Sequence, residues 1–234
     1  MTENRVVRLG CVAIVPAGGS GSRFAATVPK QYSHIVGKMV LEHTLDALST
    51  CAAIDRIFVN AQRNDNFIGE IARVFPDVMI LRSAGSTRAE TVQNALADIA
   101  KLVKRDAWIL VHDAARPCVS QADLDRLVAV AGAHAVGGLL ASPVTDTLKR
   151  ATGSGEIAET VSRDDMWRAQ TPQMFRYETL VHALASSPNV TDEAQAIEAL
   201  GMSPLLVAGS PRNIKITLPE DAELAAYYLL HRGL

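Results

Sequence analysis

The chain has 234 residues, 48% of them hydrophobic and 5% aromatic, and its 23 Lys and Arg against 25 Asp and Glu give a net charge of −2. This length suits one large α/β domain, whose core needs no disulfide or metal to be stable. The balanced charge and the few aromatic residues argue against a nucleic-acid-binding protein. The three cysteines form no Cys-x-x-Cys pair, no apolar run is long enough to cross a membrane, and the first residues lack a signal-peptide pattern. We therefore expect a cytoplasmic protein without a zinc site.

Short apolar strands alternate with longer amphipathic helices through the first 141 residues. This alternation predicts right-handed crossovers and a Rossmann-like, mostly parallel sheet with helices on both faces. Val92, Leu96, Ile99 and Val103 recur at helical spacing, which indicates one apolar stripe. The predicted strands are 11–15, 54–59, 78–81, 108–111 and 137–141, and the predicted helices are 39–49, 64–74, 88–103, 121–133, 192–200 and 219–231.

The alternation stops at about residue 142. Two strand-like runs, 146–150 and 156–161, flank the turn sequence TGSG at 152–155, which predicts a hairpin. Because the hairpin is too small and polar to fold alone, we interpret 142–172 as a β-arm within a single domain of residues 1–234. Exposed strand edges invite pairing, so the arm is a candidate contact with a second subunit.

A glycine-rich loop, PAGGSGSR at 16–23, directly follows the first strand. Glycines let backbone N–H groups approach phosphate oxygens, and ligands of parallel sheets bind at this end of the strands. Phe24 breaks the dinucleotide pattern G-x-G-x-x-G, and Arg23 breaks a P-loop counted from Gly18. A tight turn would explain the glycines alone, but Arg23 and Lys30 add two cations and favour a site for a polyanion.

Asp113 follows the apolar strand 108–111 within the sequence VHDAARP. A carboxylate at this edge can hold Mg²⁺ beside phosphates, although an ordinary loop cap is the alternative. His112 points to the opposite face, so we interpret it as structural. From the residues alone, Arg163 and Lys215 are most simply solvated charges.

Together these segments resemble the 2-C-methyl-D-erythritol 4-phosphate cytidylyltransferase family. The similarity rests on PAGGSGSR, PKQY, STRAETVQNAL, VHDAARP, DTLKR, TPQMF, TDEA and NIKIT, which follow in the family's order over nearly the whole chain. The resemblance implies a nucleotidyltransferase fold and transfer of CMP from CTP to methylerythritol phosphate, with Mg²⁺ and release of pyrophosphate, in the non-mevalonate route to isoprenoids. It also implies a homodimer that exchanges the arm, so that Arg163 acts in or near the partner's site.

The resemblance assigns roles to individual positions. Arg23 and Lys30 would stabilise the reacting phosphates, Asp113 would hold the metal, and Arg163 and Lys215 would grip the acceptor. Ser86 stands where many members of the family carry Asp, so any nucleotide contact there would use its hydroxyl. The other positions implied for substrate and nucleotide binding are Pro16, Ala17, Gly18, Gly19, Gly21, Gly85, Thr91, Ala114, Arg116 and Thr147.

Three alternatives remain open at this point. A ribitol-5-phosphate or other sugar-phosphate cytidylyltransferase would share the glycine-rich loop and differ in the acceptor pocket. A nucleotide-binding dehydrogenase is disfavoured by Phe24, and a non-catalytic nucleotide sensor by Arg23, Lys30 and Asp113. The concentration of cations around one cleft would reconcile anionic substrates with a net charge of −2.

Overall fold

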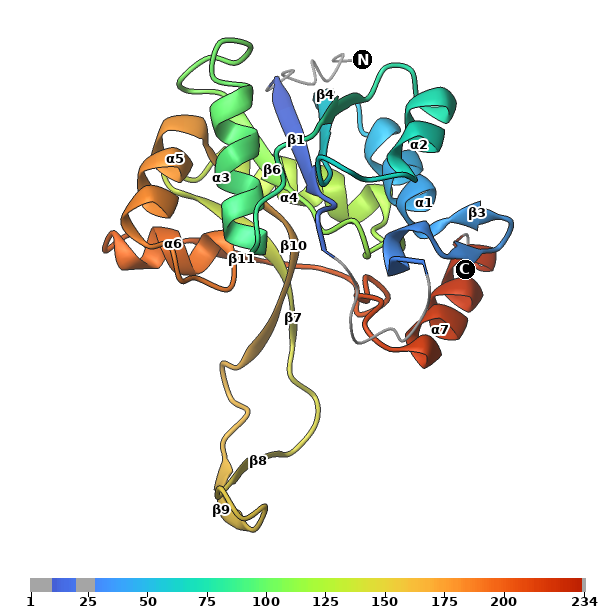
Figure 1. Ribbon diagram of the computed structural model, residues 1–234. Coiled ribbons are helices and arrows are strands. Elements are labelled where there is room, and N and C mark those ends of the chain that lie inside the picture. Colours follow the sequence, from blue (N-terminus) through green and yellow to red (C-terminus); the bar gives the residue numbers. More distant parts are fainter. Residues whose placement is uncertain (1–9, 20–27, 233–234) are drawn as a thin grey trace, which may run out of the picture.

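The computed structural model describes residues 10–19 and 28–232, so the predicted site residues Gly21 and Arg23 lie outside the described part (Figure 1). A seven-stranded sheet forms the centre of the molecule, and only its strand β10 runs antiparallel to its neighbours β6 and β7. In spatial order the strands are β11 (Leu205–Ala208), β7 (Gly137–Pro143), β10 (Trp167–Arg176), β6 (Trp108–Val111), β1 (Cys11–Pro16), β4 (Ile54–Asn60) and β5 (Met79–Leu81).

Helices cover both faces of this sheet, which confirms the predicted fold class. Strand β1 is apolar throughout because alternate side chains enter two different cores. Cys11, Ala13 and Val15 pack on one face, whereas Val12 and Ile14 pack on the other. The first face is covered by α1 (Val40–Ser49), α2 (Ile68–Val74) and α4 (Gln121–Gly132), and the second by α3 (Arg88–Asp98), α5 (Tyr177–Ser186) and α6 (Glu193–Ala199).

Two predicted helices are shorter in the structure. Helix α2 begins at Ile68 because the carboxylate of Asp65 accepts hydrogen bonds from the Phe67 and Ile68 N–H groups at 2.8 and 2.9 Å and so caps the helix there. Helix α3 ends at Asp98, so Val103 joins the apolar cluster from a turn and not from the helix. Strands β10 and β11 and helix α5 were not predicted.

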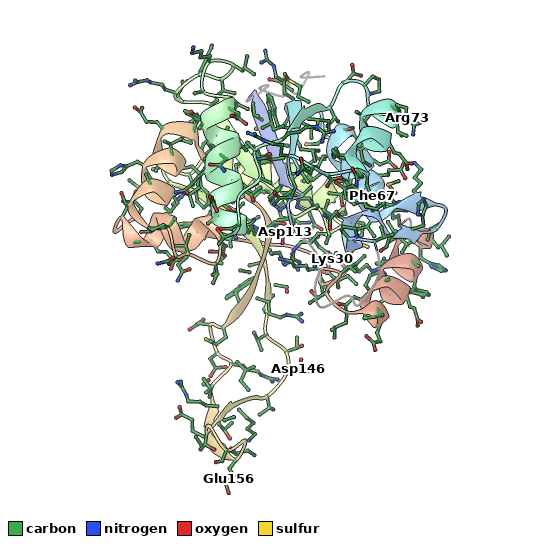
Figure 2. The ribbon with its side chains drawn as sticks, in the orientation of Figure 1. Lys30, Phe67, Arg73, Asp113, Asp146 and Glu156 are labelled. Atoms are coloured by element: carbon green, nitrogen blue, oxygen red, sulfur yellow. The ribbon has the colours of Figure 1, made fainter. Side chains whose placement is uncertain are left out.

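The predicted hairpin is present as β8 (Leu148–Ala151) and β9 (Ile157–Val161), which pair antiparallel in a sheet of their own. In Figure 1 it lies far from the large sheet, beyond the ends of β7 and β10. Figure 2 places Glu156 at its tip and Asp113 and Lys30 where the projection meets the body.

Helix α7 (Pro219–Leu230) closes the chain beside a small hairpin of β2 (His34–Ile35) and β3 (Lys38–Met39), which follows the 3-10 turn η2 (Lys30–Tyr32). Across 10–19 and 28–232, the helices are all too short or too polar to span a lipid bilayer.

Candidate active site

A pocket of about 340 Å³ lies at the carboxyl ends of β1 and β6. From β1 the chain proceeds outward to β4 and β5 and then returns to place β6 on the other side of β1. The loops after β1 and β6 therefore diverge, which opens the crevice where sheets of this type bind ligands. The pocket is lined by Pro16, Ala17, Gly18, Gly19, Lys30, Gln31, Gly85, Ser86, Thr87, Arg88, Thr91, Asp113, Ala114, Ala115, Lys215 and Thr217.

The described part of the glycine-rich loop forms one wall. The side-chain amide of Gln31 donates to the carbonyls of Ala17 and Gly19 at 2.9 and 3.0 Å, which fixes the path of the backbone. A methyl group at Gly18 would lie 2.5 Å from the Ala84 side chain, whereas one at Gly19 would meet no atom of the described residues within 4 Å. Gly18 thus allows close packing, and Gly19 leaves room for a ligand.

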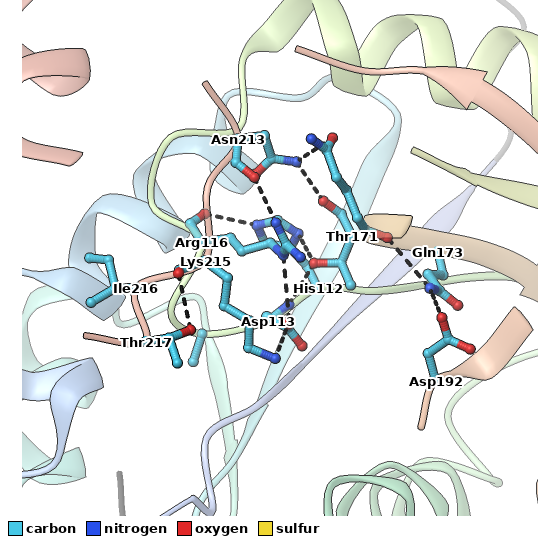
Figure 3. Close-up of polar contacts among 12 residues, drawn as sticks. His112, Asp113, Arg116, Thr171, Gln173, Asp192, Asn213, Lys215, Ile216 and Thr217 are labelled. Atoms are coloured by element: carbon cyan, nitrogen blue, oxygen red, sulfur yellow. Dashed lines mark hydrogen bonds and ion pairs between the residues drawn. The ribbon is translucent and has the colours of Figure 1, made fainter. Parts of the chain in front are cut away.

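The carboxylate of Asp113 is the electrostatic centre of the pocket. Its Oδ1 accepts from Arg88 Nε at 2.8 Å. Its Oδ2 contacts Lys215 Nζ at 2.9 Å and Arg116 Nε at 3.5 Å (Figure 3). Burial alone would raise the pKa of this carboxyl, but Arg88, Lys215 and Arg116 hold it well below its usual range. Asp113 is therefore an anion near neutral pH.

His112 fixes the backbone on which Asp113 sits. Its Nε2 lies 3.1 Å from the Arg116 carbonyl and its Nδ1 lies 3.0 Å from the Thr171 hydroxyl. Because a carbonyl only accepts, Nε2 carries the proton, and Thr171 donates to Nδ1 while accepting from the Asp113 N–H at 3.0 Å. Burial lowers the pKa of His112 to about 4, so the ring is neutral. The structural role predicted for His112 is confirmed.

The loop that follows β11 brings the two lysines together. Lys30 Nζ donates to the Ile216 carbonyl at 2.7 Å, and Lys215 precedes Ile216 and reaches Asp113. Arg116 holds the same loop, since its Nη1 donates to the Asn213 carbonyl at 2.7 Å. Arg116 thus supports the pocket from behind and is not among its lining residues.

The third wall lies before helix α3. The hydroxyl of Thr91 donates to the Thr87 carbonyl at 2.8 Å and accepts from the Gly85 N–H at 3.1 Å. The Ser86 hydroxyl donates to the Glu90 carboxylate at 2.7 Å. Gly85, Ser86 and Thr91 all line the pocket, as does Ala114 on the opposite side.

Two predicted site residues lie elsewhere. Arg163 and Thr147 belong to the segment between β7 and β10 and do not line the pocket of their own chain. The guanidinium of Arg163 donates to the Thr145 carbonyl. Both residues therefore lie on the projecting segment, away from the pocket of their own chain.

The sequence reasoning also missed residues. Gln31, Thr87, Arg88, Ala115 and Thr217 line the pocket without having been predicted as site residues. Glu193, at the start of helix α6, was not predicted as a site residue either, yet it is fully buried and paired with Arg88. Arg88 lies in the motif STRAETVQNAL and Glu193 in the motif TDEA, but only the fold shows that the two side chains meet.

The pocket can accommodate a divalent cation that arrives with phosphates. Within 10–19 and 28–232, His, Cys, Asp and Glu side chains nowhere gather in threes as a self-contained metal site would require. Mg²⁺ commonly binds one or two carboxylates and completes its coordination with substrate phosphates and water. Asp113, a single anionic carboxylate beside a glycine-rich wall and two lysines, fits that pattern.

Comparisons with known proteins agree with this geometry. Residues 11–231 match the family model described as 2-C-methyl-D-erythritol 4-phosphate cytidylyltransferase. The chain is 47% identical over 223 residues to the enzyme of that name from Chromobacterium violaceum, with 94% of this chain and 98% of the relative covered. Its relative in Dechloromonas aromatica is 48% identical, with 94% and 97% covered.

Solved structures give the same picture. A crystal structure of a 4-diphosphocytidyl-2C-methyl-D-erythritol synthase superimposes with a TM-score of 0.85 at 43% identity and covers 94% of this chain and 99% of that one. The cytidylyltransferase of Thermus thermophilus gives a TM-score of 0.77 at 27% identity, with 93% and 98% covered. The chain belongs to the 2-C-methyl-D-erythritol 4-phosphate cytidylyltransferase family.

Proposed function

We propose that this pocket transfers the cytidylyl group of CTP to the phosphate of 2-C-methyl-D-erythritol 4-phosphate and releases pyrophosphate. The observation that carries the proposal is the joint placement of Lys30, Lys215 and Asp113 around a glycine-rich wall at the switch point of the sheet. Two cations and one carboxylate suit a reaction between two polyanions. The family membership supplies the substrates.

The chemistry requires neutralised charge and alignment. The acceptor phosphate is already anionic near neutral pH, so its oxygen attacks the α-phosphorus without a general base. The P–O bond to pyrophosphate then breaks, and the leaving group departs as an anion. Lys30, with Arg23 from the sequence motif, would stabilise the reacting phosphates, while Lys215 would hold the acceptor.

A Mg²⁺ ion would bind at Asp113 together with the nucleotide phosphates and would screen their negative charge. Lys215 contacts Oδ2 of Asp113 at 2.9 Å. The lysine has 41% of its side-chain area exposed, so it can turn from the carboxylate toward an acceptor phosphate. This movement would remove one of the three cations from Asp113 and supply a cation for the acceptor phosphate.

The projecting segment would complete the site of a second copy of this chain. Arg163 and Thr147 lie on this segment and away from their own pocket. A homodimer that exchanges the segment would bring Arg163 to the acceptor phosphate of the other copy. We expect this dimer to act in the cytoplasm, where CTP is available.

The acceptor assay tests the function directly. Purified protein with CTP and Mg²⁺ should release pyrophosphate with methylerythritol phosphate and far less with ribitol 5-phosphate. The reverse ranking would assign the chain to the alternative acceptor.

Mixing two inactive variants tests the exchanged segment. In a mixed dimer of Lys30→Ala and Arg163→Ala copies, one of the two sites would have both native residues if Arg163 acts across the dimer. Mixing should then restore up to about a quarter of the wild-type activity, since half the dimers are mixed and each has one intact site. Activity no higher than in the separate variants would place Arg163 in its own chain's site or outside any site.

A further inference from the structure

Glu193 makes a contact that its position in the sequence does not reveal. It opens helix α6, where acids usually face solvent, yet only 1% of its side-chain area is exposed. Its two carboxylate oxygens accept from both terminal nitrogens of Arg88, at 2.7 and 3.0 Å. Such a two-point pair fixes the plane of the guanidinium.

The remaining nitrogen of the Arg88 guanidinium, Nε, is also hydrogen-bonded. Its Nε donates to Asp113 Oδ1 at 2.8 Å. Although Arg88 lines the pocket, its guanidinium is a rigid link that joins α6, α3 and the loop after β6. The pKa of Arg88 would be lowered by burial alone, but Glu193 and Asp113 raise it, so the link stays charged.

The two oxygens of Asp113 therefore have different partners. Oδ1 is fixed by Arg88, which is itself held by Glu193. Oδ2 meets the more exposed Lys215 at 2.9 Å and lies 3.5 Å from Arg116 Nε. A partly buried guanidinium held at three points cannot rotate without breaking several charged hydrogen bonds. The orientation of Asp113 toward the pocket is thus set by a residue that does not line it.

Glu193 also sets the charge of the pocket. Asp113 alone faces Arg88, Arg116 and Lys215, and Glu193 offsets one of these three cations. Loss of the Glu193 charge would repel a divalent cation and attract nucleotide phosphates. The two effects have opposite signs, which separates them from a general loss of structure.

We propose that Glu193 is a positioning residue for cytidylyl transfer, which clamps Arg88 and so holds the Asp113 carboxylate in the orientation in which it would bind a divalent cation. The inference rests on the metal role proposed for Asp113 above. Glu193 acts through Arg88 and Asp113 and does not itself contact substrate.

The test measures metal and nucleotide binding separately in the full-length protein. In E193Q, Mn²⁺ titrated calorimetrically in the presence of CTP should bind about tenfold more weakly, as expected for one lost charge at partly screened short range. CTP titrated in EDTA should bind as tightly as to the wild type or more tightly. D123N is the matched control, because Asp123 is also buried and paired with an arginine, Arg126, on the other face of the sheet. Its Mn²⁺ affinity should stay within about twofold of wild type.

A second variant keeps the charge and removes only the clamp. R88K cannot bridge Glu193 and Asp113 with a planar guanidinium, so it should weaken Mn²⁺ binding by a larger factor than it changes metal-free CTP binding. It serves in place of E193Q if that variant does not fold. Unchanged Mn²⁺ affinity in the folded variants, or parallel losses of Mn²⁺ and CTP affinity, would overturn the inference. Wild-type protein that binds no Mn²⁺ with CTP would instead overturn the proposed metal role.

Discussion

His112 makes the stability of this enzyme depend on pH. Burial lowers its pKa from 6.5 to about 4, so the folded protein keeps the ring neutral while the unfolded chain protonates it. Between these values the unfolded state binds more protons, and the free energy of unfolding therefore falls as the pH decreases. The shift corresponds to about 3 kcal/mol, which is present above pH 6.5 and lost by about pH 4. Asp113 does not contribute to this pH dependence of the free energy of unfolding. The stabilisation from its ion pairs is lost only as the pH falls through the ordinary carboxyl pKa and below it.

Urea unfolding at several pH values between 7.5 and 4.5 measures this effect. His112→Gln can still donate to the Arg116 carbonyl but does not titrate, so its stability should be lower at pH 7.5 and should fall less steeply with pH. His182→Gln is the control, because His182 is exposed and its replacement should leave the wild-type slope. Burial also lowers the pKa of His43, which adds the same slope to all three proteins. An equal slope in His112→Gln and wild type would refute the assignment of a buried neutral imidazole.

The remaining predictions concern the pocket and the sheet. Lys30→Ala should lower kcat by about 100-fold or more while the melting temperature changes little, and an active variant would remove Lys30 from the transition state. Gly19→Ala should fold normally and bind CTP more weakly. Gly18→Ala should be less stable, because its methyl group would meet the Ala84 side chain. Equal stability of the two variants would contradict the close contact between Gly18 and Ala84. Gly138→Ala should cost about 1–3 kcal/mol in urea unfolding, because a Cβ there would strike the Leu205 carbonyl across β7 and β11.

The sequence predicted those parts of the fold that depend on local patterns. Strand β6 has the predicted bounds of 108–111, because its four residues are all apolar and buried in the middle of the sheet. Strand β10 was missed because Gln170, Pro172 and Gln173 interrupt its apolar pattern. Gln173 is nevertheless buried, and its side chain donates to Asp192 at 3.0 Å and accepts from the Ala194 N–H at 2.8 Å. Polar residues in a central strand are tolerated when the fold supplies their partners, and these partners lie on another element.

In the site, too, residues in local motifs could be predicted and contacts between distant segments could not. Lys30, Asp113 and Lys215 lie in short motifs that resemble those of a family, and the structure brings them to one pocket. Glu193 could not be predicted as part of the site, because its partner Arg88 is 105 residues away and an acid beside an N-cap has an ordinary explanation. Arg116 was predicted as a substrate contact, but burial and its bond to the Asn213 carbonyl place it behind the pocket wall. Contacts between distant segments are what the sequence patterns lack.

Strand β10 links the length of the projecting segment to the position of the loop that contains Asp113. At one end Trp167 pairs with Pro143, and at the other Gln173 pairs with Val111, while Thr171 between them bonds His112 and the Asp113 N–H. A one-residue deletion within this stretch would turn the following side chains to the opposite face and withdraw the Thr171 hydroxyl. Insertions at the hairpin tip, around 152–155, change no such register. Among members of the family, insertions and deletions are therefore expected at the hairpin tip and not in the few residues before Thr171.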